Sequence, residues 1–105
     1  MILNKYCLTN SKDIAHEFMH AFGFWHEHQR PDRDRFVKIQ EQFIKEYFVQ
    51  DFAKHQNTIT FGLPYDGLSM MHYQPWVHSI NPNDPSKRAI VSKVCIGKWE
   101  VSKLL

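Results

Sequence analysis

The sequence of 105 residues lacks several features that would assign it to a class at once. No apolar run approaches the roughly 18 residues of a membrane-spanning helix. Its 13 basic and 11 acidic residues leave a net charge of +2. Such a small positive excess does not indicate nucleic acid or an anionic membrane as a partner. The sequence has no internal repeat, low-complexity tract or clear linker, so one domain is expected.

Cysteine is scarce, and the amino-terminal residues carry no leader signal. Residues 1–5 are too few and too polar to form the apolar segment of a signal peptide. The two cysteines are Cys7 and Cys95. They can pair with each other or both remain free thiols, and two cysteines alone cannot decide between these states.

Histidine is concentrated in residues 16–26, which read HEFMHAFGFWH. Residues four apart lie one turn above each other on a helix, so His16 and His20 can bind the same metal ion. Glu17 lies about 100° round the same helix, from where its carboxylate can reach water at the metal. Gly23 has no Cβ and can adopt a positive φ. A turn there would end the helix and direct His26 back towards the metal.

This spacing is typical of a catalytic zinc site. Three protein ligands leave a fourth coordination position open for water, whereas structural zinc sites are closed. A His-Glu-x-x-His pair alone also occurs on solvated helix faces, so surface polarity is the alternative interpretation of His16 and His20. The added Gly-x-x-His strongly favours the metal site, because it places two further rare residues in the correct order.

Two later motifs agree with the zinc run. Residues 27–34 read EHQRPDRD, and residues 69–73 read SMMHY. Together the three motifs resemble the astacin family of zinc metalloendopeptidases, a group of metzincins in which a methionine turn follows the zinc run. The resemblance covers nearly the whole chain, from about Cys7 to Leu105.

The resemblance implies a role for each polar residue of the zinc run. His16, His20 and His26 would hold one Zn²⁺ per chain, and Glu17 would be the general base that activates water. The reaction would be hydrolysis of an internal peptide bond without a covalent intermediate. The partner would therefore be a protein or peptide substrate.

The resemblance also implies roles outside the zinc run. Met71 would form an apolar floor beneath the metal, without a bond to it. Tyr73 would be a weak zinc ligand at rest and would swing away to hydrogen-bond the tetrahedral intermediate; ordinary core packing is the alternative for this side chain. Glu27 would be buried near the mature amino terminus, where it would help to organise the site.

No catalytic or metal-binding role is expected for the other polar residues near these motifs. Four charged side chains of the second motif are expected to form local ion pairs rather than to touch substrate: Arg30, Asp32, Arg33 and Asp34. The remaining histidines are interpreted as surface or structural side chains: His28, His55, His72 and His78.

The fold class implied is α+β, a zincin-like metzincin catalytic domain that is incomplete. Residues 1–105 would form a partial peptidase domain, with the zinc helix and an irregular carboxy-terminal subdomain. The amino-terminal sheet, which cradles the zinc helix in the family, would be largely absent, and the chain would be cut at both ends. An amino-terminal half or a propeptide would then be missing. Because family members are usually secreted, an extracellular location is expected.

Periodicity and turn residues predict few regular elements. The expected elements are a helix over 11–22, an apolar stripe at helical spacing over 39–54, loops over 57–69 and 74–87, and a short strand within 89–96. Asn10 is the expected cap of the first helix, whose apolar face would lack the family's sheet to cover it. The stripe is interpreted as core.

Two functions from different classes remain open. The motifs favour a zinc metalloendopeptidase, whereas the missing part of the domain favours an inactive zinc-binding remnant that acts as an interaction protein. A basic nucleic-acid module has no supporting motif.

Overall fold

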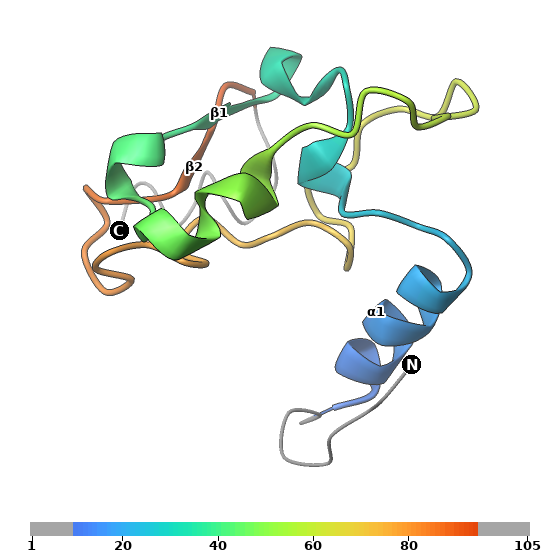
Figure 1. Ribbon diagram of the computed structural model, residues 1–105, viewed down its shortest axis with the longest axis horizontal. Coiled ribbons are helices and arrows are strands. Elements are labelled where there is room, and N and C mark those ends of the chain that lie inside the picture. Colours follow the sequence, from blue (N-terminus) through green and yellow to red (C-terminus); the bar gives the residue numbers. More distant parts are fainter. Residues whose placement is uncertain (1–9, 95–105) are drawn as a thin grey trace.

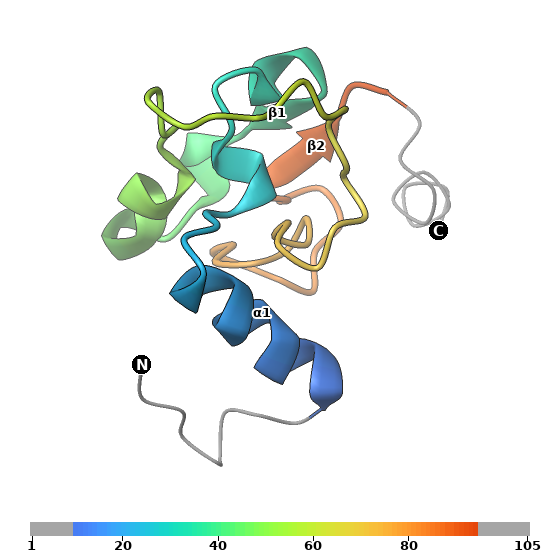
Figure 2. The ribbon, with the colours of Figure 1, turned by 90° about the vertical axis from the view of Figure 1, so that its right-hand side faces the viewer.

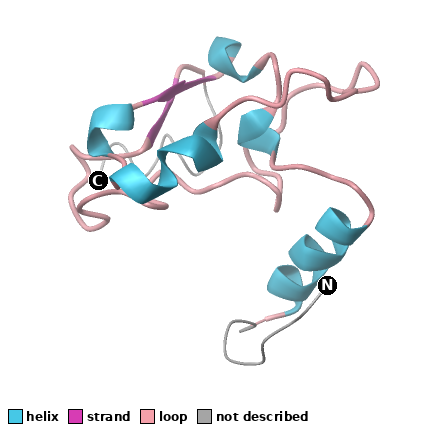
Figure 3. Ribbon diagram, in the orientation of Figure 1, coloured by secondary structure: helices cyan, strands magenta, loops and turns pink. Residues whose placement is uncertain are grey.

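The computed structural model describes residues 10–94 of the chain. Both cysteines, Cys7 and Cys95, lie outside the described residues, and so their state, paired or free, does too. The elements, in chain order, are helix α1 (Ser11–Ala21), 3₁₀ helices η1 (Glu27–Gln29) and η2 (Arg33–Arg35), strand β1 (Val37–Ile39), 3₁₀ helices η3 (Glu41–Phe43) and η4 (Glu46–Phe52), and strand β2 (Ile90–Ser92). Two views show α1 projecting from a body that contains the other elements (Figures 1 and 2). Loops make up much of that body (Figure 3).

Helix α1 begins and ends where local rules place its boundaries. The Asn10 side-chain oxygen accepts hydrogen bonds from the backbone N–H groups of Lys12, at 2.9 Å, and Asp13, at 3.2 Å. These bonds satisfy two of the donors that the first turn of a helix leaves without a partner. The helix ends at Ala21, and Gly23 then adopts a φ of +94°. A helix was expected over 11–22, and the observed end differs by one residue.

The apolar face of α1 is exposed. No residue of the helix is buried, and the exposed fractions of Ile14 and Phe18 are 40% and 46%. The neighbouring Phe22 is 76% exposed. Within residues 10–94, the expectation that this face would lack a covering surface is therefore confirmed.

The hydrophobic core lies around a two-stranded antiparallel sheet. Val37 of β1 pairs with Ser92 of β2, and Ile39 pairs with Ile90. The buried apolar side chains of this core are Val37, Ile44, Phe52, Ala89 and Ile90. The strand expected within 89–96 is observed as the three residues of β2. Helices together with a small antiparallel sheet make the described part an α+β fold.

The apolar stripe over 39–54 does not form one regular helix. It is divided into η3 and η4 by Ile44, whose backbone is extended and forms a β-bridge with Ser79. Pairing with a distant segment therefore overrides the helical periodicity. The interpretation as core is correct for Ile44 and Phe52, which are buried, but wrong for Tyr47, which is 81% exposed.

The segments expected to be loops, 57–69 and 74–87, contain no helix or strand. Across the part of the chain that the structure describes, no helix has both the length and the apolar character needed to cross a membrane.

A matched pair of isoleucine variants tests the position of the core. Ile90 is fully buried, whereas Ile59 is 76% exposed. Ile90→Ala should lower the free energy of unfolding by about 2–5 kcal/mol, because it removes buried methyl groups and leaves a cavity. Ile59→Ala should change it by less than about 0.5 kcal/mol. Urea unfolding measures both values, and equal losses would contradict this core.

Candidate metal centre

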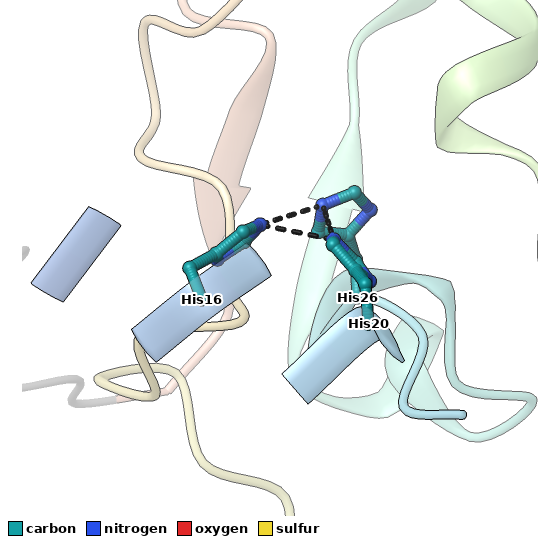
Figure 4. A group of neighbouring side chains, drawn as sticks. All are labelled: His16, His20 and His26. Carbon is teal, nitrogen blue, oxygen red and sulfur yellow. Dashed lines mark hydrogen bonds between the residues drawn. The ribbon is translucent and has the colours of Figure 1, made fainter. Parts of the chain in front are cut away.

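Three imidazole rings meet beside the carboxy-terminal half of α1. His16 and His20 lie one turn apart on the helix, and His26 follows the Gly23 turn. The Nε2 atom of His20 lies 3.0 Å from that of His16 and 3.2 Å from that of His26, and the third separation is 3.3 Å. In Figure 4 the three rings converge, and dashed lines join the nitrogens that face one another.

The turn after α1 brings the third histidine back. Gly23 N–H donates to the His20 carbonyl at 3.0 Å, and Phe24 N–H donates to the Met19 carbonyl at 3.0 Å. The positive φ of Gly23 is a conformation that residues with a Cβ rarely adopt. The chain therefore reverses immediately beyond the helix, and His26 approaches the other two rings from a second direction.

The outer nitrogens of the two helical histidines each face a carbonyl oxygen. His16 Nδ1 lies 2.7 Å from the Met70 oxygen, and His20 Nδ1 lies 2.8 Å from the Phe24 oxygen. A carbonyl oxygen can only accept a hydrogen bond, so each Nδ1 must carry the proton. In a neutral imidazole the Nε2 atom then carries a lone pair.

The same reasoning applies to His26. Its Nδ1 lies 3.1 Å from the side-chain oxygen of Gln29. The amide nitrogen of Gln29 donates to the Asp51 carbonyl at 3.0 Å, which directs the amide oxygen towards His26. In the neutral form of the three rings, the Nε2 atoms therefore have no proton to share with one another, and their lone pairs converge on one point. Such an arrangement is favourable only around a cation.

The geometry of this cluster fits zinc. Tetrahedral coordination with Zn–N distances of about 2.0–2.1 Å places two ligand nitrogens roughly 3.3 Å apart. The observed separations of 3.0–3.3 Å agree with this value. Three histidines leave a coordination position open, which is the pattern of catalytic rather than structural zinc sites. Within residues 10–94, this cluster is the one group of histidine, cysteine, aspartate and glutamate side chains able to hold a metal ion.

Burial keeps His26 in the form that binds metal. Desolvation lowers the pKa of His26 to about 4; the neighbouring His20 acts in the same direction, and the hydrogen bond that His26 donates to Gln29 opposes them. The imidazole is therefore neutral at neutral pH, as metal ligation requires.

Glu17 offers a carboxylate next to the cluster. It follows His16 on α1, and its side chain is partly exposed. Among residues 10–94, Glu17 has no hydrogen-bond or ion-pair partner, so its carboxylate is available to a water molecule or a substrate.

Tyr73 lies against the third histidine. Its ring centroid is 4.6 Å from that of His26, and the ring stacks on His28 at 4.1 Å. Burial raises the pKa of the Tyr73 phenol, so the hydroxyl stays protonated and able to donate. The stacking partner is itself neutral, because burial lowers the pKa of His28 to about 3.

The methionine turn is tied to both sides of the cluster. The Met70 carbonyl faces His16 Nδ1, and the carbonyl of Met71 accepts from Glu27 N–H at 2.8 Å. The Met71 side chain is buried, with 5% exposed. Glu27 also accepts from the backbone N–H of Asp66 at 3.0 Å. The turn is therefore held by α1 and by the residue that follows His26.

The expectation of local ion pairs in the second motif is correct. Arg30 pairs with Glu27 at 3.1 Å and with Asp32 at 2.9 Å, and Arg33 pairs with Asp34 at 2.8 Å. Arg30 also donates to the carbonyls of residues 63 and 64. Sequence reasoning did not find these carbonyl contacts or the role of Gln29 beside His26, because neither has a local signal.

A cavity of about 960 Å³ lies on the Glu27 side of the cluster. His26 lines it together with several exposed apolar side chains, among them Trp25, Phe61 and Leu63. Neither Glu17 nor Tyr73 is among the lining residues. The cavity therefore adjoins the candidate centre at His26 and is not lined by either of these two residues.

Comparison with known proteins identifies the family of this chain. The family model for Astacin, a family of peptidases, matches residues 1–102, and the chain belongs to this family. An astacin-like metalloendopeptidase of Coturnix japonica is 52% identical over 62 residues, which are 59% of this chain and 15% of that protein. The zinc metalloproteinase nas-14 of Caenorhabditis elegans is 49% identical over 70 residues, which are 65% of this chain and 14% of that protein.

A solved structure supports the fold. High choriolytic enzyme 1 of Oryzias latipes, a hatching enzyme zinc-protease, matches with a TM-score of 0.74 and 31% identity. The match covers 90% of this chain and 50% of that chain. The chain thus spans half of this structure and about a seventh of the two relatives named above. The described part has the α+β fold of a metzincin-like fragment, and zinc is the metal of its relatives.

Zinc content tests the histidine cluster. The purified chain should bind one Zn²⁺, and His20→Ala should abolish tight binding because two nitrogens cannot replace three. His55→Ala is the matched control, since His55 lies outside the cluster, stacked on Trp25. A chelator should lower the melting temperature of the parent chain and of the control. Unchanged zinc content in His20→Ala would contradict this assignment.

Proposed function

We propose that this chain is a zinc-dependent metalloendopeptidase that hydrolyses internal bonds of protein or peptide substrates. The observation that carries the proposal is the convergence of three Nε2 lone pairs from His16, His20 and His26. Glu17, which has an available carboxylate, follows His16 in the chain. Tyr73, which has a protonated phenol, packs its ring against that of His26. Family membership supports the same reaction class.

The three histidines would hold the metal, and Glu17 would transfer the proton as a general base and acid. When bound, zinc polarises the scissile carbonyl and lowers the pKa of a coordinated water from 15.7 to about 7. Glu17 would accept a proton from the attacking water and would then pass it to the departing amine. General acid–base catalysis of this kind contributes typically about 10²–10⁴-fold.

Tyr73 stabilises charge that develops during the attack. Its phenol is protonated, and among residues 10–94 it has no hydrogen-bond partner. The hydroxyl is therefore free to donate to the substrate oxygen that becomes negative in the transition state. Removing a comparable donor from other enzymes costs about 3–4 kcal/mol.

Substrate and location follow from the family. The High choriolytic enzyme 1 of Oryzias latipes is described as a hatching enzyme zinc-protease. For this chain we propose only the broader class of protein or peptide substrates and an extracellular site of action. Nothing in the geometry selects one peptide sequence.

A zinc-binding protein without catalysis is the second candidate. The exposure of α1 favours this candidate, because within the described part of the chain no residue of this helix is buried. A misplacement of about 1 Å can cost 10²-fold in rate, so an unsupported zinc helix would bind metal and still fail to catalyse. Peptide hydrolysis by the zinc-loaded chain, blocked by a chelator, would exclude this candidate.

Replacing Glu17 tests whether this residue is the general base or a metal ligand. Glu17→Gln should keep its zinc and lose about 10²–10⁴-fold in kcat, because an amide cannot accept the proton. Glu46→Gln is the matched control at an exposed position on η4. Hydrolysis of an internally quenched peptide and zinc content measure the two effects. Loss of zinc from Glu17→Gln, or full activity, would refute this role.

Replacing Tyr73 tests the proposed oxyanion donor. Tyr73→Phe should lower kcat by about 10²–10³-fold with KM unchanged, because the lost hydrogen bond forms in the transition state. Tyr47→Phe is the control, since Tyr47 is 81% exposed. An increase in KM alone would show that Tyr73 binds substrate uniformly and is not the donor proposed here.

A further inference from the structure

His72 is buried between two tyrosines. Its exposed fraction is 4%, its Nε2 lies 2.5 Å from the Tyr65 hydroxyl, and its Nδ1 lies 2.6 Å from the Tyr73 carbonyl oxygen. The carbonyl can only accept, so Nδ1 carries the proton. In a neutral imidazole protonated at Nδ1, the Nε2 atom carries the lone pair. The Tyr65 hydroxyl therefore donates to Nε2, and the imidazole donates to the backbone of Tyr73.

This contact matters because Tyr73 lies in no helix or strand. A loop backbone has no ladder of hydrogen bonds to fix it. Within residues 10–94, the His72 imidazole is the one hydrogen-bond partner of the Tyr73 main chain. The Tyr73 ring packs against four other rings, those of His26, His28, Phe52 and His78. Such ring contacts are less directional than a hydrogen bond. The backbone contact is thus the directional restraint on this residue.

Tyr65 provides a rigid anchor for the pair. Its ring stacks on Phe36 with centroids 4.7 Å apart and an interplanar angle of 3°. The Arg30 guanidinium lies 5.5 Å from the centroid of the same ring. The next residue, Asp66, donates its backbone N–H to Glu27 at 3.0 Å. Tyr65 is therefore held by two contacts of its ring and through the neighbouring main chain.

We propose that Tyr65 and His72 are positioning residues that aim the phenol of Tyr73 at the reacting carbonyl. Tyr65 orients the imidazole of His72, and the imidazole fixes the backbone from which the Tyr73 side chain extends. The inference rests on the proposed function, because Tyr65 and His72 can act as positioning residues only if Tyr73 donates a hydrogen bond in the reaction.

A double-mutant cycle tests this coupling. Tyr65→Phe should lower kcat by up to about 10²-fold with KM and zinc content unchanged, since it misplaces the donor without removing it. In a Tyr73→Phe background the same change should cause no further loss, because the group that it positions is gone. Tyr47→Phe, at an exposed tyrosine, should leave both backgrounds unchanged. Equal losses from Tyr65→Phe in both backgrounds would overturn the proposal.

A second measurement needs no activity. In the parent chain, ¹⁵N NMR should show His72 protonated at Nδ1 and accepting at Nε2. Tyr65→Phe should shift the Nε2 signal, and the ring signals of selectively labelled Tyr73 should report faster motion. His72→Asn, whose amide can donate to the Tyr73 carbonyl, should restore slow motion relative to His72→Ala. Unchanged Tyr73 signals in a folded Tyr65→Phe chain would refute the positioning role.

The two proposals fail in different ways. If Tyr73→Phe retains full kcat, Tyr73 is not the donor and the proposed function is wrong at this residue. If Tyr73→Phe loses kcat but the NMR signals and the cycle show no coupling to Tyr65, the positioning proposal alone is wrong.

Discussion

Three lone pairs that point at one spot repel each other, and the rest of the site is arranged around this constraint. Each imidazole is fixed by a hydrogen bond from its outer nitrogen to an oxygen of a different segment, at Met70, Phe24 and Gln29. These outer contacts set the tautomer and leave the inner nitrogens without protons. A divalent cation removes the repulsion and needs no change in any of the outer contacts.

The carbonyls of the methionine turn connect the parts of the site. The carbonyl of residue 70 accepts from His16, that of residue 71 from the backbone of Glu27, and that of residue 73 from His72. Helix α1 and the chain after His26 thus meet on one short stretch of main chain, which is also held by its own His72. The carbonyl oxygens of this loop therefore connect the parts of the site, while its side chains at His72 and Tyr73 carry the roles proposed above.

The parts of the molecule that depend on local chemistry could be predicted from the sequence. The start of α1 at its Asn10 cap, the turn at Gly23 and the meeting of the three histidines all depend on spacing within a few turns of chain. Family membership was likewise recognisable from motifs. The roles of Glu17 and Tyr73 stay predictions until activity is measured.

The parts that depend on long-range pairing could not be predicted. The bridge between Ile44 and Ser79 divides a stripe that looked helical. The contact from Gln29 to His26 and the contact from Tyr65 to His72 join side chains whose positions are set by the fold of the loops. Of the two interpretations of His72, surface or structural, the structural one is correct, because the ring is buried and hydrogen-bonded through both ring nitrogens.

The isolation of α1 gives the metal a mechanical role beside its chemical one. No residue of the helix is buried, and the hydrogen bond from His16 to Met70 connects α1 to the chain beyond residue 26. An ion shared by His16, His20 and His26 is then a cross-link that closes a short loop between the helix and the body. Like any cross-link, it would reduce the conformational entropy of the unfolded chain. A bound ion would therefore add a restraint on the position of α1 relative to the body, beside the hydrogen bond from His16 to Met70.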